Sequence, residues 1–305
     1  MRLPHDRQRQ DLAKGLALMA FAMTILPGMD GIAKYLATVQ SMSPGQVTFY
    51  RFFFQLLLTL PLLLTIGGAH AFRARRPWMN LLRGALHAAA TLLFFTAVKY
   101  MPLADVFAIY FVEPFMLVAL MAVFLGERVE WRRWLAIVIG FGGAMIVIQP
   151  SFALFGATSL LPVLCAFLFA LYLFMNRAIG DADPPLTMQT VSGFGGALFS
   201  GAALLAGNWA GNDDFAMSLP SSAFLFGLLI VLGALSAYGH LLVVRAFRLA
   251  PISLLAPFQY FEIISATILG FAVFGEFPTL SKWIGIVVIV GSGLYVIWRE
   301  RRVSA

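Results

Sequence analysis

Long apolar runs follow one another along almost the whole chain, separated by short polar breaks. Each run is long enough to cross about 30 Å of hydrocarbon as an α-helix. The breaks are rich in Pro, Gly or charged residues, which end helices. No stretch is left over for a soluble domain. The pattern predicts an all-α membrane protein with ten transmembrane helices, at residues 13–36, 44–66, 78–99, 102–125, 131–149, 157–178, 185–207, 222–246, 251–274 and 280–298.

The apolar pattern also repeats. Residues 84–148 reappear without a gap at 233–297, and the matched pairs include Pro102/Pro251, Glu113/Glu262, Gly126/Gly275, Glu127/Glu276 and Trp134/Trp283. We therefore predict two five-helix repeats, residues 1–150 and 151–305. Because five is odd, the second repeat would enter the membrane from the opposite side. Such an inverted repeat around a central cavity is typical of transporters.

The basic residues predict the orientation of the chain. Cytoplasmic loops of membrane proteins carry an excess of Lys and Arg. With the N-terminus inside, all but four of the 21 Lys and Arg residues fall on the cytoplasmic side. Lys34, Lys99 and Lys282 fall on the opposite side, and Arg51 lies within the second apolar run. We therefore expect both termini in the cytoplasm.

Composition agrees with a multi-pass membrane protein, because 61% of the residues are hydrophobic and 11% are charged. The net charge of +7 follows from the basic cytoplasmic loops, so we expect contact with the lipid bilayer and no nucleic acid. The first run contains Pro27, Gly28, Asp30 and Lys34 and has no small-residue cleavage site, which predicts a retained helix. Cys165, the single cysteine, is expected to serve packing.

Two glutamates are the leading candidates for chemistry. Glu113 and Glu262 lie at matching depths near the middle of their spans. A carboxylate there costs several kcal/mol unless it is neutral, paired or facing water. One interpretation is that one or both bind a substrate ammonium group or carry a proton. The other is that a helix terminus or a hydroxyl satisfies each glutamate, which then helps to join the two repeats.

Further polar side chains are expected near these glutamates. His87 and His240 lie in the paired third and eighth spans, and His240 aligns with Thr91. They would either line a cavity or bond as buried neutral histidines across helices. Helical spacing puts Tyr110 on the face of Glu113 and Gln259 on the face of Glu262. Together with Tyr238, Tyr172 and Asn176, these residues would form a mostly aromatic substrate-binding pocket.

Other charged residues and prolines are given structural interpretations. Asp30 and Lys34 stand four positions apart, which predicts a local ion pair or an outer gate. Asp105 is expected to be solvated near the outer interface. Pro27, Pro114, Pro162 and Pro257 interrupt spans and free carbonyl groups beside a cavity.

Motifs of soluble enzymes are absent from the sequence. It contains no phosphate-binding Gly-Lys-Ser/Thr loop, no His-Glu-x-x-His and no Cys-x-x-Cys. We therefore predict no catalytic residues, no metal and no cofactor, and transport that is secondary or facilitated. A membrane-embedded enzyme using the Glu and His residues as acid and base is a remote alternative.

The chain resembles the drug/metabolite transporter superfamily, and within it the ten-helix EamA-type exporters. The resemblance rests on Glu113-Pro114-Phe115 through Leu125-Gly126-Glu127, on the second Gly-Glu at 275–276, and on the Trp of each fifth helix. Ile263 replaces the proline in the second half. Arg51 matches an arginine usual in the second helix, where the resemblance implies a structural role.

Within that superfamily the sequence is most similar to the YddG-type exporters of aromatic and other amino acids. This resemblance implies a basket-like bundle whose cavity is lined by helices one, three, four, six, eight and nine. We accordingly predict a monomeric, multi-pass exporter of amino acids in the bacterial inner membrane, working by alternating access. The alternative is another small metabolite or a cationic drug, such as a flavin or a nucleoside derivative.

Overall fold

The structure is a computed structural model that describes residues 4–67, 74–125, 131–179, 183–250, 255, 258–259 and 261–303. The described residues form α-helices joined by short connections, and they contain no strand. Seven helical spans in this part are long and apolar enough to cross a membrane, and three shorter apolar helices accompany them at Trp134–Ile148, Phe261–Phe274 and Leu280–Tyr295. The all-helical membrane class that the apolar runs predicted is therefore confirmed.

Helix boundaries fall close to the ends of the apolar runs. Polar breaks and prolines explain this agreement, since α2, α3 and α8 each begin at a proline, where the missing N–H costs nothing. The helices are α1 (Pro4–Thr38), α2 (Pro44–Gly67), α3 (Pro77–Tyr100), α4 (Leu103–Tyr110), α5 (Glu113–Leu125), α6 (Trp131–Phe155), α7 (Leu161–Ile179), α8 (Pro185–Trp209), α9 (Ala223–Leu249), α11 (Phe261–Phe274) and α12 (Leu280–Val303).

The expected span 102–125 is two helices in the structure. Pro114 has no N–H to bond to the carbonyl of Tyr110, so the helical ladder is interrupted there. Helix α4 ends at Tyr110, and the chain restarts as α5, with the N–H groups of Phe115 and Met116 bonding to Val112 O at 3.1 Å each. The paired α11 also starts late, at Phe261. Pro257 and the Gly126-Glu127 turn lie outside the described residues.

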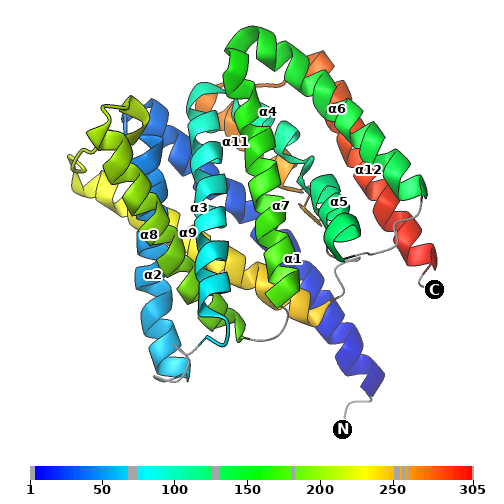
Figure 1. Ribbon diagram of the computed structural model, residues 1–305. Helices are drawn as coiled ribbons and strands as arrows, with labels where there is room; N and C mark the ends of the chain where they lie inside the picture. The colour runs from blue at the N-terminus through cyan, green and yellow to red at the C-terminus, as the bar shows by residue number, and fades with distance from the viewer. Residues whose placement is uncertain are drawn as a thin grey trace.

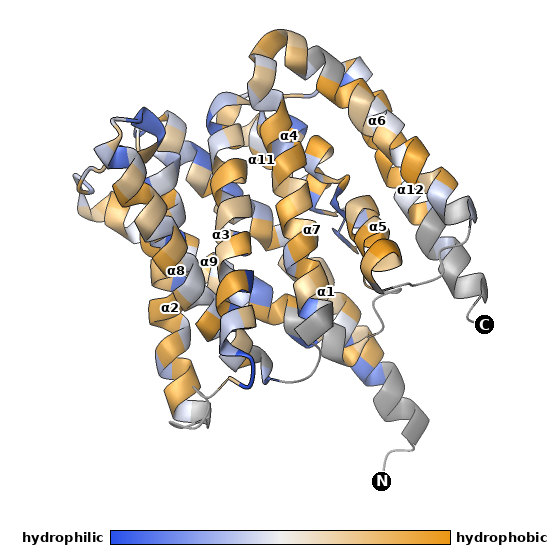
Figure 2. Cartoon of the chain, in the orientation of Figure 1, coloured by the Kyte–Doolittle hydropathy of each residue, from blue (hydrophilic) through white to orange (hydrophobic). Residues whose placement is uncertain are grey.

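The helices form a bundle with a side pair (Figure 1). Helix α1 packs on α9 and α11, α2 on α8 and α9, and α3 on α7 and α8, while α6 and α12 pack on each other at one side. Both termini lie toward the same end of the bundle, at the bottom of Figure 1. Apolar residues dominate the long helices along their length (Figure 2).

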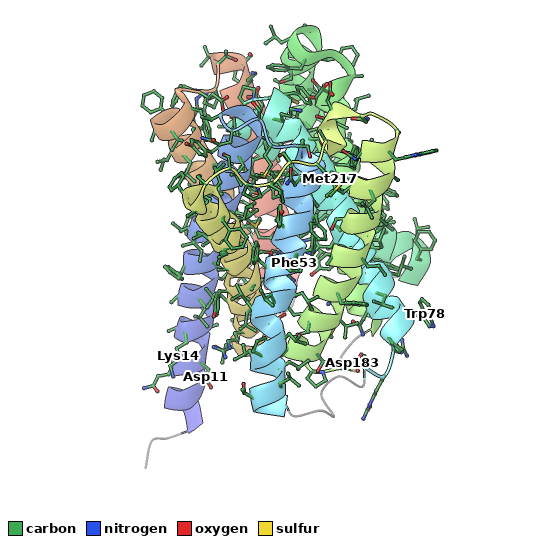
Figure 3. The ribbon with its side chains drawn as sticks, turned by 90° about the vertical axis from the view of Figure 1, so that its left-hand side faces the viewer. Asp11, Lys14, Phe53, Trp78, Asp183 and Met217 are labelled. Atoms are coloured by element: carbon green, nitrogen blue, oxygen red, sulfur yellow. The ribbon has the colours of Figure 1, made fainter. Side chains whose placement is uncertain are left out.

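Exposed side chains differ between the middle and the lower end of the bundle. In the turned view of Figure 3, the exposed Asp11 and Lys14 lie toward the lower end of the bundle and Phe53 lies at mid-height. The Phe53 side chain is 40% exposed. An exposed phenylalanine at mid-height and charged side chains at one end agree with a bundle whose middle lies in hydrocarbon.

Ion pairs join helices at the upper end of the bundle. Lys34 was expected to pair with Asp30, but its Nζ instead donates to both oxygens of Glu276, at 2.6 and 2.7 Å, and to Met101 O at 2.9 Å. The expected local pair is therefore wrong. The reason is that Glu276, which follows the end of α11, also accepts from the N–H of Leu103 at 3.1 Å and so sits directly over Lys34.

Asp105 is also placed differently from the expectation. It is 1% exposed and paired with Lys282 of α12, so it is not solvated. Lys99 pairs with Asp214 at 2.5 Å. Each of the three lysines expected on the non-cytoplasmic side thus contacts a carboxylate, and all three pairs connect a residue of the first half to a residue of the second.

Glycines allow close approach of the helices at two equivalent places. A Cβ on Gly84 of α3 would collide with the carbonyl oxygen of Ser192 and lie 3.0 Å from the N of Gly196, both on α8. A Cβ on Gly233 of α9 would collide with Phe54 of α2. Without a hydrophobic driving force between helices in lipid, such backbone proximity provides much of the packing energy.

We predict opposite effects of two Gly→Ala substitutions. Gly84→Ala should lower the free energy of unfolding by about 1–3 kcal/mol, because the added methyl meets a fixed backbone carbonyl. Gly142→Ala is the matched control, since open space surrounds that position in α6 and alanine favours the helix by up to about 1 kcal/mol. Thermal unfolding of both purified variants in one detergent measures the difference. Equal midpoint temperatures would contradict the close contact between α3 and α8.

Candidate functional site

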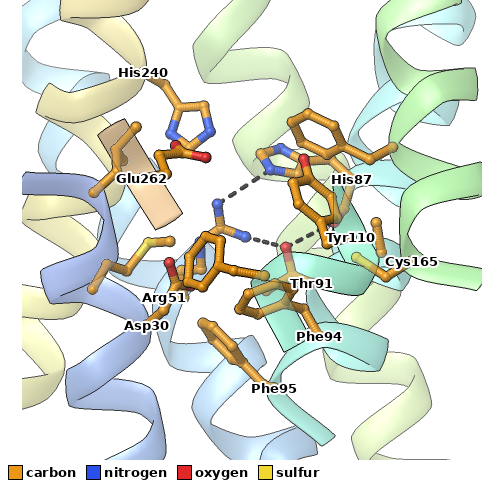
Figure 4. Close-up of a pocket in the computed structure, with 15 residues that line it drawn as sticks. Asp30, Arg51, His87, Thr91, Phe94, Phe95, Tyr110, Cys165, His240 and Glu262 are labelled. Atoms are coloured by element: carbon orange, nitrogen blue, oxygen red, sulfur yellow. Dashed lines mark hydrogen bonds between the residues drawn. The ribbon is translucent and has the colours of Figure 1, made fainter. Parts of the chain in front are cut away.

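Arg51 lies at the centre of the bundle, on α2, with 2% of its surface exposed. Its guanidinium donates from Nε to Ser236 Oγ at 3.1 Å. It also donates from Nη1 to Thr91 Oγ1 and from Nη2 to His87 Nε2 at 3.2 Å (Figure 4). Thr91 and His87 belong to α3, and Ser236 belongs to α9. One side chain therefore ties three helices together.

These bonds fix the protonation pattern of both histidines on chemical grounds. Arginine only donates, so His87 Nε2 is the acceptor and the ring proton is on Nδ1. His240 Nδ1 lies 2.9 Å from Ser236 O, which only accepts, so His240 carries a proton on Nδ1. The Nε2 atom of His240 is then available as a further polar group of the ring.

Ser236 is hydrogen-bonded to three residues of this site, Arg51, Gln55 and His240. Its hydroxyl accepts from Arg51 and donates to Gln55 Oε1 at 2.8 Å, while its carbonyl accepts from His240. Gln55 and Arg51 stand one turn apart on α2. The polar groups of α2 and α9 are thus matched donor to acceptor, which is what a low-dielectric interior requires.

A cavity of about 90 Å³ opens beside the Arg51 guanidinium. Its lining combines acidic, basic, hydroxyl and aromatic side chains from seven helices. The lining residues are Leu26, Met29, Asp30, Arg51, His87, Ala90, Thr91, Phe94, Phe95, Phe107, Tyr110, Cys165, Phe169, His240 and Glu262. Of the residues predicted from the sequence, the structure brings His87, Thr91, Tyr110, His240 and Glu262 to this cavity.

Aromatic rings form one wall of the cavity. The ring of Phe94 packs against Phe107 and Tyr110, with centroids 5.1 and 5.8 Å away, and Tyr110 packs against Phe169 at 5.7 Å. These rings come from α3, α4 and α7. The His87 ring continues the wall, with its centroid 5.6 Å from that of Phe169. A flat, polarisable group would find matching faces here.

Two carboxyl groups contribute to the lining. Asp30 of α1 is 7% exposed and lies within electrostatic range of Arg51, and Glu262 stands in the first turn of α11 near His240. Asp30 was interpreted from the sequence as a partner of Lys34, and Arg51 as structural. Both are ionisable residues inside apolar runs, and such residues usually mark functional sites in membrane proteins. This rule alone would have identified Asp30 and Arg51 as candidates for the cavity.

Other predicted residues lie outside the lining. Tyr172 stacks on His87 with centroids 4.6 Å apart, and Asn176 accepts a hydrogen bond from Arg83. Tyr238 is 55% exposed. Gln259 is partly exposed and is not among the lining residues.

Glu113 is also outside the lining. Its side chain is 4% exposed, and its Oε1 has no hydrogen-bond partner among the described residues. Helical spacing had put it on one face with Tyr110, but that argument needs a continuous helix. The break before Pro114 places Tyr110 at the end of α4 and Glu113 at the start of α5. Glu113 therefore lies in the first turn of α5, where the helix dipole favours a negative charge, and it is not among the residues that line the cavity.

Comparison with known proteins identifies the kind of molecule. The sequence model of the EamA-like transporter family matches residues 13–149 and again residues 156–298. An S-adenosylmethionine uptake transporter of Rickettsia bellii is 27% identical over 94% of each chain. A riboflavin transporter of Brucella anthropi is 29% identical over 85% of this chain and 89% of its own. A pseudopaline exporter of Pseudomonas aeruginosa is 26% identical over 92% of this chain and 94% of its own.

A solved crystal structure supports the same fold. It covers 91% of this chain and 95% of its own chain with a TM-score of 0.64, at 18% identity. The matches to the family model span most of the sequence, and all three relatives carry the names of transporters or exporters. The drug/metabolite transporter resemblance is thereby confirmed at the family level. This chain belongs to the EamA-like transporter family and is a multi-pass membrane protein.

Proposed function

We propose that this protein transports a small metabolite that combines a flat ring system with a cationic group, and that nucleoside derivatives such as S-adenosylmethionine fit best. The observation that carries the proposal is the cavity itself, which is lined both by the carboxyl-bearing Asp30 and Glu262 and by the rings of Phe94, Phe107 and Phe169. S-adenosylmethionine has a flat adenine ring, a sulfonium and an ammonium group. The name of the Rickettsia relative supports this substrate class.

Riboflavin is the second candidate, favoured by the aromatic lining and by the name of the Brucella relative. Its ring is flat but uncharged, so it would use the aromatic wall and the hydroxyl and imidazole groups more than the carboxyl groups. Amino acids, which the resemblance to YddG-type exporters suggested, receive less support, because the relatives named above are named for other substrates. We assign substrate contact to His87, Thr91, Tyr110, His240 and Glu262.

Transport would follow from two inverted five-helix halves, residues 1–150 and 151–305, in the bacterial inner membrane. Three observations support that organisation. The family model matches each half separately. The first helix of each half packs on the third helix of the other half: α1 packs on α9, and α7 packs on α3. The equivalent Gly84 and Gly233 both mark close helix contacts. Two similar halves that exchange conformations would open the cavity first to one side and then to the other.

The size of the cavity fits a transporter that closes around its cargo. Sites for ligands of this size measure about 300–1,000 Å³, several times the cavity of about 90 Å³ seen here. Binding therefore requires the walls to separate. The break between α4 and α5 lies beside the cavity, next to Tyr110, where backbone adjustment costs least.

Purified protein in sealed liposomes should take up radiolabelled S-adenosylmethionine in a saturable manner. We expect competition by unlabelled S-adenosylmethionine and by adenosine derivatives with a cationic group, with weaker competition by phenylalanine or lysine. Liposomes without protein give the background. Uptake of riboflavin with no effect of S-adenosylmethionine would favour the second candidate. Competition by amino acids alone would overturn the proposal in favour of amino-acid transport.

The two buried glutamates should differ in their effect on binding. Glu262→Gln is expected to weaken S-adenosylmethionine binding by at least about tenfold, because it removes a charged partner of the cation. Glu113→Gln is the matched control, since that residue lies outside the cavity, and its affinity should stay within about twofold of the unchanged protein. Equilibrium binding of the labelled ligand in detergent measures both. Equal losses in the two variants would remove Glu262 from the site.

A further inference from the structure

Arg51 is a buried cation whose hydrogen-bond partners among the described residues are all uncharged. They are the hydroxyl oxygens of Ser236 and Thr91 and the Nε2 atom of His87. A guanidinium remains charged in proteins, and removing it from water costs several kcal/mol unless an anion compensates it. The polar network satisfies individual N–H groups, but it does not supply the opposite charge.

The carboxylate with the strongest electrostatic effect on Arg51 is that of Asp30, and it does not contact the guanidinium. Ion pairs with N···O distances up to 4.0 Å among the described residues join Lys34 to Glu276, Lys99 to Asp214 and Lys282 to Asp105. Asp30 and Arg51 do not form such a pair, although both line the cavity and attract each other. Space for a ligand therefore adjoins the guanidinium and the carboxylate.

Arg51 retains donors for an anion. A guanidinium has five N–H bonds, and the three hydrogen bonds of Arg51 use one each on Nε, Nη1 and Nη2. Two N–H bonds, one on each terminal nitrogen, have no further partner among the described residues. Two donors on a planar fork are the arrangement that arginine uses to hold a carboxylate with two oxygens.

We propose that Arg51 binds the carboxylate of the transported molecule while Asp30 and Glu262 bind its cationic group, so that the protein selects zwitterions. This inference rests on the proposed function and specifies its substrate class. The ring of the substrate lies along Phe94, Phe107 and Phe169, and its two charges meet the opposite charges of the cavity. A molecule with a cation alone leaves Arg51 without a contacting anion and binds less tightly.

The test compares two ligands that differ only in the carboxylate. S-adenosylmethionine and its decarboxylated form are titrated against the purified protein, and the ratio of the two dissociation constants is the measured quantity. The unchanged protein should prefer the carboxylate-bearing ligand by at least about tenfold. Arg51→Gln should reduce the ratio to about one. Arg51→Lys, which keeps the charge and loses the fork, should give an intermediate ratio and serves if the Gln variant does not fold.

Arg83→Gln is the matched control for a buried arginine. Arg83 is 4% exposed and also bonds to neutral groups, Asn176 Oδ1 and Met188 O, but it does not line the cavity. Its variant should keep the preference of the unchanged protein. A ratio that falls equally in the Arg51 and Arg83 variants would overturn the proposal, because the loss would then reflect structure and not contact with the carboxylate.

A second ligand pair separates failure of this inference from failure of the proposed function. Phenylalanine and 2-phenylethylamine also differ only in the carboxylate. If neither adenosyl compound binds but phenylalanine is preferred through Arg51, the nucleoside proposal fails and the role of Arg51 stands. If both adenosyl compounds bind equally well, the nucleoside proposal stands and the role of Arg51 fails. Absence of binding by all four ligands would overturn both.

Discussion

A permanent positive charge in the middle of a membrane bundle is the constraint on which the rest of this structure depends. The Arg51 guanidinium cannot lose its proton, and lipid offers it no partner. Hydroxyl and imidazole groups of α3 and α9 therefore converge on it, and α2 is held against both helices. The same convergence places the guanidinium beside the cavity, whose lining combines its polar groups with aromatic and aliphatic side chains. The buried charge of Arg51 thus both holds three helices together and forms part of the cavity lining.

Charges at the upper end of the bundle act in a different way. Lys34–Glu276 and Asp105–Lys282 are contacting pairs, so each cation already has its anion and no ligand is needed. The glutamate of the Gly-Glu turn reaches Lys34 because Gly275 adopts a left-handed conformation, with φ of 69°, that ends α11 and redirects the chain. The pairs join α1 and α4 to segments of the second half. The molecule thus separates charges that pair with each other at the upper end of the bundle from charges that line the cavity without contacting each other.

Much of the fold could be predicted because a membrane leaves the chain few choices. Every backbone N–H and C=O in hydrocarbon must be bonded within its own helix, so apolar length alone gave ranges close to those of α2, α3 and α8. The partners of side chains could not be predicted in the same way. Spacing along a helix shows that Asp30 and Lys34 are able to touch, but not that Glu276, far along the chain, binds Lys34 more closely. Helical spacing likewise failed for Tyr110 and Glu113 because Pro114 breaks the helix between them. Thr91 and His240, which the 149-residue shift aligns with each other, both line the cavity, and so does His87 one turn from Thr91.

The separation of Asp30 from Arg51 connects recognition with movement. A ligand shifts a conformational equilibrium only by its difference in affinity for the two states. In the compact arrangement the two charges attract each other across a cavity too small for a metabolite of this size. Under the proposed recognition, a zwitterion replaces that long-range attraction with two contacting pairs, and it can do so only once the walls have moved apart. A molecule with one charge would satisfy one side of the cavity and leave the other buried without a contacting partner. The charge pattern of the substrate would therefore decide both whether it binds and whether the bundle opens to admit it.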